Sequence, residues 1–270
     1  MAALRVQGLG WALVMALAGA ARGGEADAWR FVQLSDPHCA QATTNPPARH
    51  LLHRLDLVHS FDLLEAAVRE INAKVKPDFV VVTGDLVNYG RDLASLRRVK
   101  AILGRLACPC YPVIGDHDSR ASWREVFGAA RLNYAFTHRG WRFLAVDCNP
   151  GRLDPPTMAW LERALRTQTT TPTILLIHRP LVIPEIYVQA ARRLYGVPLL
   201  TENAGEVRKL LVKRGNVRAV LAGHCHTAIE CTADGMSHCV APALADVGHA
   251  YRIVEIRGTT ISTKLRTLGK

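Results

Sequence analysis

The sequence has few of the features that mark fibrous, modular or membrane-embedded proteins. It contains no low-complexity segment and no internal repeat, and beyond its N-terminal region no apolar run is long enough to span a bilayer. No pair among the seven cysteines has zinc-finger spacing. Aromatic residues make up only 6% of the chain and form no platform for stacking nucleic-acid bases. These absences leave a globular protein whose chemistry depends on other side chains.

A large positive charge is present, at a formal net value of +11. Such an excess can indicate an anionic partner such as nucleic acid. The basic residues fall in separate segments, at 97–100, 192–193 and 209–214, and not in one stripe. Hydrolysis of nucleic acid therefore stays open, although basic residues scattered over solvated surfaces account for the charge more simply.

The N-terminus has the pattern of a secretory signal peptide over residues 1–20. Arg5 precedes an apolar run from Leu9 to about Ala20, and Ala18-Gly19-Ala20 has the small-x-small form of a cleavage site. We expect a secreted or periplasmic protein with no stable membrane span in the mature chain; an uncleaved hydrophobic anchor is the alternative. No cysteine lies at the cleavage site itself, so a lipoprotein is not expected.

The cysteine count is odd, so in an oxidising compartment at least one thiol stays free or pairs between molecules. Cys231 and Cys239 flank Asp234-Gly235, which is a hairpin-turn signal. They could pair across two strands, or they could be two unlinked thiols.

The hydrophobic pattern predicts one α/β domain over residues 29–268. Short runs rich in β-branched and aromatic residues predict strands at 29–35, 79–82, 111–114, 133–137, 141–146, 173–177 and 217–222, with short strands after them. Helical spacing predicts helices at 60–71, 92–106, 122–127, 156–166 and 202–214. Two long connections remain, at 39–59 and at 179–201, and the second resembles a lid. We expect these two segments to set the choice of substrate.

Five of the predicted strands end in carboxylate or imidazole side chains. These are Asp36 and His38, Asp85, Asp116 and His117, His178, and His224 and His226. Singly, such residues are more typical of helix caps or of hydrogen-bonded core histidines. Together they lie where open α/β sheets bind ligands, at the carboxyl ends of strands. The repetition favours a functional site.

The donor set suits two metal ions. Oxygen and nitrogen donors without thiolates are typical ligands of manganese, iron, zinc or nickel. In Asp36-x-His38 and His224-x-His226 the paired side chains point the same way on an extended backbone. The ligands are too many for one ion, and two ions about 3.5–4 Å apart would share a carboxylate and act as a clamp in phosphoester hydrolysis.

The chain resembles the calcineurin-like metallophosphoesterases over nearly all of residues 29–256. The resemblance is carried by Asp36-x-His38, Gly84-Asp85, Gly115-Asp116-His117-Asp118, His178 and Gly223-His224-x-His226. The segment from Gly84 to Asn88 is most similar to the class III cyclic-nucleotide phosphodiesterase branch. The resemblance implies a four-layer αββα sandwich of two mixed β-sheets flanked by helices.

The resemblance also implies a role for each residue. Asp36, His38 and His226 would hold the first metal ion, and His178, His224 and Asp116 the second. Asp85 would bridge the two ions. His117 would protonate the leaving oxygen or contact the phosphate.

The implied activity is hydrolysis of a small phosphodiester, cyclic-nucleotide-like or other, by a hydroxide that bridges two divalent metal ions. One alternative is a phosphomonoesterase that uses the same site. The other is a catalytically weak protein that binds metal or phosphate. The sequence does not indicate an oligomeric state.

Asp116 departs from the family pattern, which has asparagine at this position. The asparagine oxygen ligates metal while its nitrogen can donate to the substrate phosphate. An ionised aspartate can ligate but cannot donate, and its charge opposes an anionic substrate. This reasoning predicts that Asp116→Asn raises kcat/KM about tenfold or more with metal content unchanged. Alternatively, His117 or a backbone N–H already supplies the donor.

Overall fold

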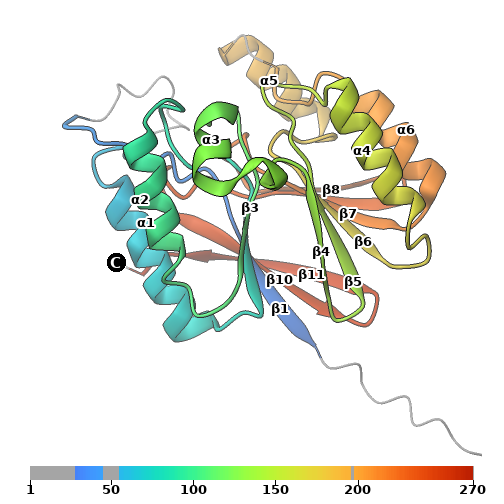
Figure 1. Cartoon of the computed structure of the whole chain (residues 1–270), viewed down its shortest axis with the longest axis horizontal. Coiled ribbons are helices and arrows are strands. Elements are labelled where there is room, and N and C mark those ends of the chain that lie inside the picture. The colour runs from blue at the N-terminus through green and yellow to red at the C-terminus, as the bar shows by residue number, and fades with distance from the viewer. Residues whose placement is uncertain (1–27, 45–54, 196–197, 270) are drawn as a thin grey trace, which may run out of the picture.

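Two mixed β-sheets lie face to face, with helices on both outer surfaces (Figure 1). The computed structural model describes residues 28–44, 55–195 and 198–269. The arrangement is the four-layer sandwich expected from the sequence.

The first sheet has the strand order β11-β10-β1-β2-β3 within the described residues. Its strands are β1 (Trp29–Leu34), β2 (Phe79–Val82), β3 (Cys110–Pro112), β10 (Ala250–Arg257) and β11 (Thr260–Thr267). β1, β2 and β3 are parallel, while β10 runs antiparallel to β1 and β11 antiparallel to β10. The carboxyl ends of the three parallel strands therefore share one edge of this sheet.

The second sheet has the order β4-β5-β6-β7-β9-β8 within the same residues. Its strands are β4 (Tyr134–His138), β5 (Trp141–Ala145), β6 (Thr173–Leu176), β7 (Val217–Ala222), β8 (Ile229–Ala233) and β9 (Met236–Val240). Neighbours from β5 to β9 are parallel, and the edge strands β4 and β8 are antiparallel. The predicted strands 133–137 and 141–146 pair as an antiparallel hairpin, and a second hairpin, β8–β9, turns at the predicted Asp234-Gly235.

Helices cover each sheet on its outer side (Figure 1). The first sheet is covered by α1 (Ser60–Glu70, continuing as a π-helical turn over Ile71–Val75), α2 (Leu93–Leu103) and α3 (Arg120–Phe127), followed by a short 3₁₀ turn at Ala129–Arg131. The second is covered by α4 (Pro155–Arg166) and α6 (Ala204–Arg214). Asp92 and Asp154 cap α2 and α4, because their carboxylates accept the N–H groups of Ser95 and Thr157.

The core explains why the central strands lack polar alternation. In β2, Phe79 and Val81 pack between the two sheets, whereas Val80 and Val82 pack under the helices. Phe79 stacks on Phe31 with ring centroids 4.8 Å apart. Both faces of the strand are buried, so both need apolar side chains.

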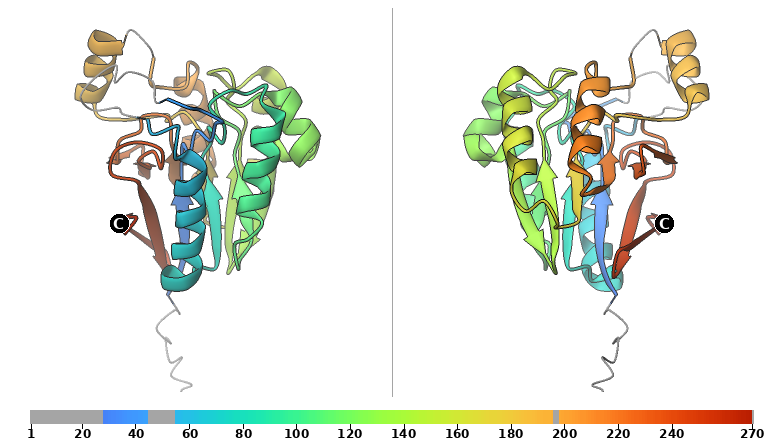
Figure 2. Two further views of the ribbon diagram at one scale, coloured as in Figure 1. Left: turned by 90° about the vertical axis from the view of Figure 1, so that its left-hand side faces the viewer. Right: turned by 90° about the vertical axis from the view of Figure 1, so that its right-hand side faces the viewer.

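The segment 179–201 contains a helix that the sequence analysis did not predict. This helix, α5 (Glu185–Tyr195), stands beyond the ends of the sheets and apart from the other helices (Figure 2). Of its described side chains only Val188 and Ala191 are buried, and Ile186 is 73% exposed. The helix does have an apolar side in the sequence, but Pro180, Pro184 and Pro198 surround it and favour a loop.

A disulfide between Cys231 and Cys239 is not present, and all seven cysteines are free thiols. Cys231 lies opposite His238, and Cys239 lies opposite Glu230. Directly opposed residues share a face and adjacent residues alternate, so the two thiols point to opposite faces of the sheet.

The predicted signal peptide and part of the 39–59 connection lie outside the described residues. Among the residues that are described, no helix combines the length and the hydropathy needed to cross a membrane.

Candidate metal centre

The predicted ligands converge at the carboxyl ends of strands from both sheets, in loops with an uncommon backbone. Asp36, His38, Asp85, His224 and His226 all have positive φ angles, between 43° and 68°. Side chains other than glycine rarely adopt this conformation, and it costs about 1–3 kcal/mol for each residue. Such strain concentrates at functional sites, and here it turns each loop sharply after its strand.

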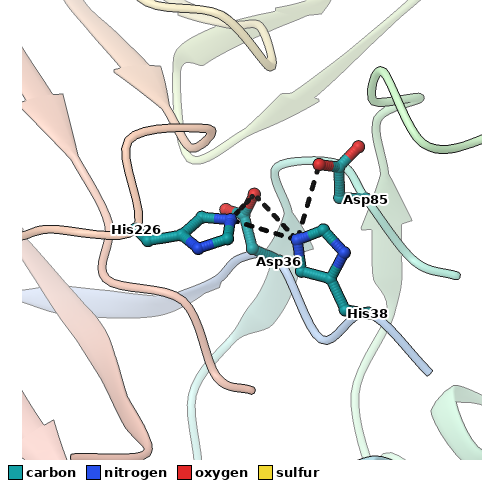
Figure 3. A group of neighbouring side chains, drawn as sticks. All are labelled: Asp36, His38, Asp85 and His226. Atoms are coloured by element: carbon teal, nitrogen blue, oxygen red, sulfur yellow. Dashed lines mark hydrogen bonds and ion pairs between the residues drawn. The ribbon is translucent and has the colours of Figure 1, made fainter. Parts of the chain in front are cut away.

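One group comprises Asp36, His38, Asp85 and His226, whose donor atoms face one another (Figure 3). His38 Nε2 lies 3.1 Å from His226 Nε2 and 3.6 Å from Asp85 Oδ2. Asp36 Oδ1 lies 3.9 Å from His38 Nε2 and 3.5 Å from His226 Nε2. Ligands bound to one ion at about 2.1 Å are separated by roughly 3–4 Å, so these four donors fit a single metal ion.

A second group comprises Asp116, His178 and His224. Asp116 Oδ2 lies 3.4 Å from His224 Nδ1. Three buried atoms of the group, Asp116 Oδ1, His178 Nε2 and His224 Nε2, have no hydrogen-bond partner among the described residues. Buried polar atoms are normally paired, so these atoms fit a metal ion as their missing partner.

Asp85 lies between the two groups. Its Oδ1 accepts the backbone N–H of His117 at 2.8 Å. Its Oδ2 is 3.6 Å from His38 Nε2 in the first group and 3.3 Å from His178 Nε2 in the second. One carboxylate oxygen therefore reaches both groups.

The electrostatics suit metal ligation. Burial lowers the pKa of His38 and of His224 to about 3, which keeps both rings neutral with a free lone pair. Burial disfavours charge on His178 and Asp85 as well, but their ion pair prevails. It raises the pKa of His178 well above its ordinary value and holds that of Asp85 well below it. The buried carboxylates therefore require compensating positive charge, which a proton on His178 supplies by itself and which a metal ion would supply in place of that proton.

Contacts around the ligands fix their orientation. His178 Nδ1 donates to the Thr83 carbonyl at 2.8 Å, which leaves Nε2 directed at Asp85. Asp36 Oδ2 accepts the His224 backbone N–H at 3.2 Å and also the Ser35 hydroxyl. A Cβ at position 223 would overlap the Ser35 hydroxyl and the Asp36 carboxylate, so only glycine fits there. Such outer contacts hold ligands in their productive geometry.

His117 is exposed at the edge of the centre. Its Nδ1 lies 2.9 Å from the Asn88 carbonyl, which can only accept, so Nδ1 carries a proton and Nε2 remains available. Its ring meets that of His38 edge-on at 4.7 Å. The side chain can thus reach a molecule bound over the first group.

Arg179 is a residue that the sequence analysis missed. Its Nε donates to Asp116 Oδ2 at 2.5 Å, and both side chains are 13% exposed. The expectation that Asp116 carries an uncompensated charge therefore omitted its partner. A signal was available, because Arg179 directly follows a predicted ligand in a chain with one carboxylate more than the family pattern.

Asp118, the last residue of the motif Gly115-Asp116-His117-Asp118, holds together the loop that follows β2 and the loop that follows β3. It is 4% exposed, and its carboxylate accepts the backbone N–H groups of Leu86 at 3.3 Å, Val87 at 3.2 Å and Gly115 at 2.9 Å.

We expect Asp118→Ala to lower the free energy of unfolding by about 3 kcal/mol, because three buried donors lose their acceptor. Chemical denaturation measures this loss. Asp118→Asn, which keeps one carbonyl acceptor, should lose less, and equal stability of all three proteins would contradict the supporting role.

Comparison with known proteins gives a consistent result. The family model described as calcineurin-like phosphoesterase matches residues 30–228. A Synechococcus protein named "Probable cyclic nucleotide phosphodiesterase" is 29% identical over 159 residues, covering 56% of this chain and 59% of its own. A cAMP/cGMP dual specificity phosphodiesterase of Mycobacterium tuberculosis is 29% identical over 202 residues, covering 69% of this chain and 60% of its own. The chain thus spans about three fifths of these relatives.

A solved structure shows the same fold. The dimetal phosphatase from Danio rerio superposes with a TM-score of 0.68 at 18% identity, covering 89% of this chain and 99% of that one. At this identity the likeness concerns the fold alone. The family match extends from β1 into the loop that carries His224 and His226, and so contains every predicted ligand. The chain belongs to the calcineurin-like phosphoesterase family.

Proposed function

We propose that this chain is a dinuclear metal-dependent phosphodiesterase that acts on small phosphodiesters. The observation that carries the proposal is the position of Asp85 Oδ2, 3.6 Å from a ligand of the first group and 3.3 Å from a ligand of the second. Two adjacent ions sharing a carboxylate are the arrangement that clamps a phosphoryl group. The phosphodiesterase names of the two curated relatives support the same substrate class.

The proposal assigns each predicted ligand to one of the two metal ions. Asp36, His38 and His226 would hold the first ion, and Asp116, His178 and His224 the second, with Asp85 shared. When bound, the two ions would acidify a water molecule and draw charge from the phosphoryl oxygens. His117 would hold a proton on Nε2, within reach of the leaving oxygen. Ligands come from both sheets, which supports treating residues 29–268 as one catalytic domain.

The donor set supports manganese, iron, zinc or nickel as the metal. The first group offers two imidazoles and two carboxylates, and the second two imidazoles and one carboxylate. Cys225 lies between two of the ligands, but burial raises its pKa to about 12, so it remains a thiol. Thiolate-preferring metals are therefore disfavoured.

An ester panel tests the proposal. Protein loaded with each of the four metals is assayed on bis(p-nitrophenyl) phosphate, p-nitrophenyl phosphate, a 3′,5′-cyclic nucleotide and single-stranded DNA. We expect the diester and the cyclic nucleotide to be hydrolysed faster than the monoester. A preference for the monoester would instead indicate a phosphomonoesterase. Two bound ions with no turnover on any ester would indicate a protein that only binds metal or phosphate.

We also propose that the protein is exported, on the strength of the apolar run and Ala18-Gly19-Ala20. The mature chain is then expected to begin near Ala21. Mass spectrometry of protein recovered from the extracytoplasmic fraction measures its N-terminus. An intact Met1 on cytoplasmic protein would overturn the proposal, whereas an intact Met1 on membrane-bound protein would support the uncleaved anchor.

A further inference from the structure

The two oxygens of Asp116 are in different environments. Oδ2 accepts the Arg179 Nε–H at 2.5 Å. Oδ1 is buried and has no hydrogen-bond partner among the described residues. Asp116 is also one of the three side chains of the second ligand group. Oδ1 is thus available to a metal ion, while Oδ2 is paired with the guanidinium group of Arg179.

This division parallels the two functions of an asparagine at the same position. The amide oxygen would ligate, and the amide nitrogen would donate to a phosphoryl oxygen. In this chain Oδ2 replaces that nitrogen, and the guanidinium on Oδ2 supplies N–H groups in its place. The carboxylate and the guanidinium together carry no net charge, as the neutral amide would.

Arg179 is held firmly beside the second ligand group. Its backbone follows His178 directly, and its carbonyl accepts the Thr201 hydroxyl at 2.9 Å. A Cβ at Gly151 would approach Nη1 to 3.0 Å, so the guanidinium packs against that glycine. Within the described residues, Nε is the only guanidinium nitrogen of Arg179 with a hydrogen bond. Nη1 and Nη2 keep their N–H groups for another acceptor.

We propose that Arg179 binds the phosphoryl group, donating from its Nη atoms to a non-bridging oxygen, and that Asp116 positions it. This inference rests on the proposed function and adds to it a binding residue and the ligand class, a tetrahedral phosphoryl anion. Guanidinium groups suit this ligand because their planar donors match two oxygens at once. The earlier expectation for Asp116→Asn changes accordingly: alone it removes the anchor of Arg179, so kcat/KM should not rise tenfold.

The test uses binding of inorganic phosphate to the metal-loaded protein, measured by titration calorimetry. We expect Arg179→Met to weaken phosphate binding about tenfold or more, through loss of charge-assisted hydrogen bonds. Asp116→Asn in the Arg179→Met background should restore binding to within about threefold of the wild type, because the amide then donates. Bound metal, from elemental analysis, should be the same in all three proteins.

Controls separate binding from folding. Arg179→Lys keeps the positive charge but loses the planar set of N–H donors, so we expect a phosphate affinity between those of the wild type and Arg179→Met. Arg208→Met breaks an exposed pair with Asp234, 2.7 Å from Nε, and should leave binding unchanged. If Arg179→Met and Arg179→Lys change the melting temperature but bind phosphate as the wild type does, Arg179 is structural and the inference fails. If the wild type itself binds no phosphate with two ions present, the proposed function fails with it.

Discussion

The Asp85→Ala variant is expected to lose at least one metal ion per chain and to lose measurable turnover. The wild type should contain about two transition-metal ions per chain, because two ligand groups meet at this carboxylate. Removing it takes one ligand from each ion and also the acceptor of the His117 N–H. We expect kcat/KM on a simple phosphodiester to fall by at least about 10³-fold, because orientation and charge stabilisation are lost together.

Two further variants make this result interpretable. Asp85→Asn keeps the shape and an oxygen ligand but removes the charge, so it should retain more metal than Asp85→Ala. Asp234→Ala removes a carboxylate whose cation partner is Arg208, outside both ligand groups, and should keep both ions and full activity. A variant of Asp85 that retains two ions and wild-type turnover would contradict the assignment of Asp85 as the carboxylate shared by two metal ions.

The convergence of the candidate ligands could be predicted from sequence because the information for it is local. Each stands within a few residues of the end of a buried strand, and the motifs record both the strand and the turn after it. Glycine at 84, 115 and 223 completes three of these motifs because a Cβ at each would overlap another part of the centre. The four layers were implied by the family resemblance, and the apolar run Phe79–Val82 agrees with them because both of its faces are covered.

Contacts that depend on tertiary convergence could not be derived from the sequence, which could draw attention to Arg179 but not name its partner. Asp116 and Arg179 are 63 positions apart, and only the juxtaposition of the two sheets brings their side chains together. The faces of Cys231 and Cys239 depend on the pairing register of β8 and β9, which a turn signal alone does not fix. The helix α5 was missed because three prolines in the segment 179–201 favoured a loop, although Pro184 in fact only precedes the first helical residue, Glu185.

Two roles predicted for His117 give different kinetics, and we expect those of a general acid. Nδ1–H donates to the Asn88 carbonyl, so a proton on Nε2 is the one that can be given to a leaving oxygen. His117→Ala should therefore slow hydrolysis of an alkyl phosphodiester by about 10²–10⁴-fold. Hydrolysis of a p-nitrophenyl ester should slow much less, because p-nitrophenolate leaves without protonation. Steady-state kinetics on matched alkyl and p-nitrophenyl diesters measure the difference.

The His117→Asn variant distinguishes the two roles of His117, that of a general acid and that of a residue that only contacts the phosphate. Asparagine offers an N–H donor of similar reach but no proton to transfer at neutral pH. If His117 acts as the acid, this variant should be as slow on the alkyl ester as His117→Ala, with both ions still bound. If His117 only contacts the phosphate, the asparagine should recover most of the activity and both esters should slow alike. Equal slowing of the two esters would mean that His117 is not the acid and that water protonates the leaving oxygen, while the assignment of the metal ligands would stand.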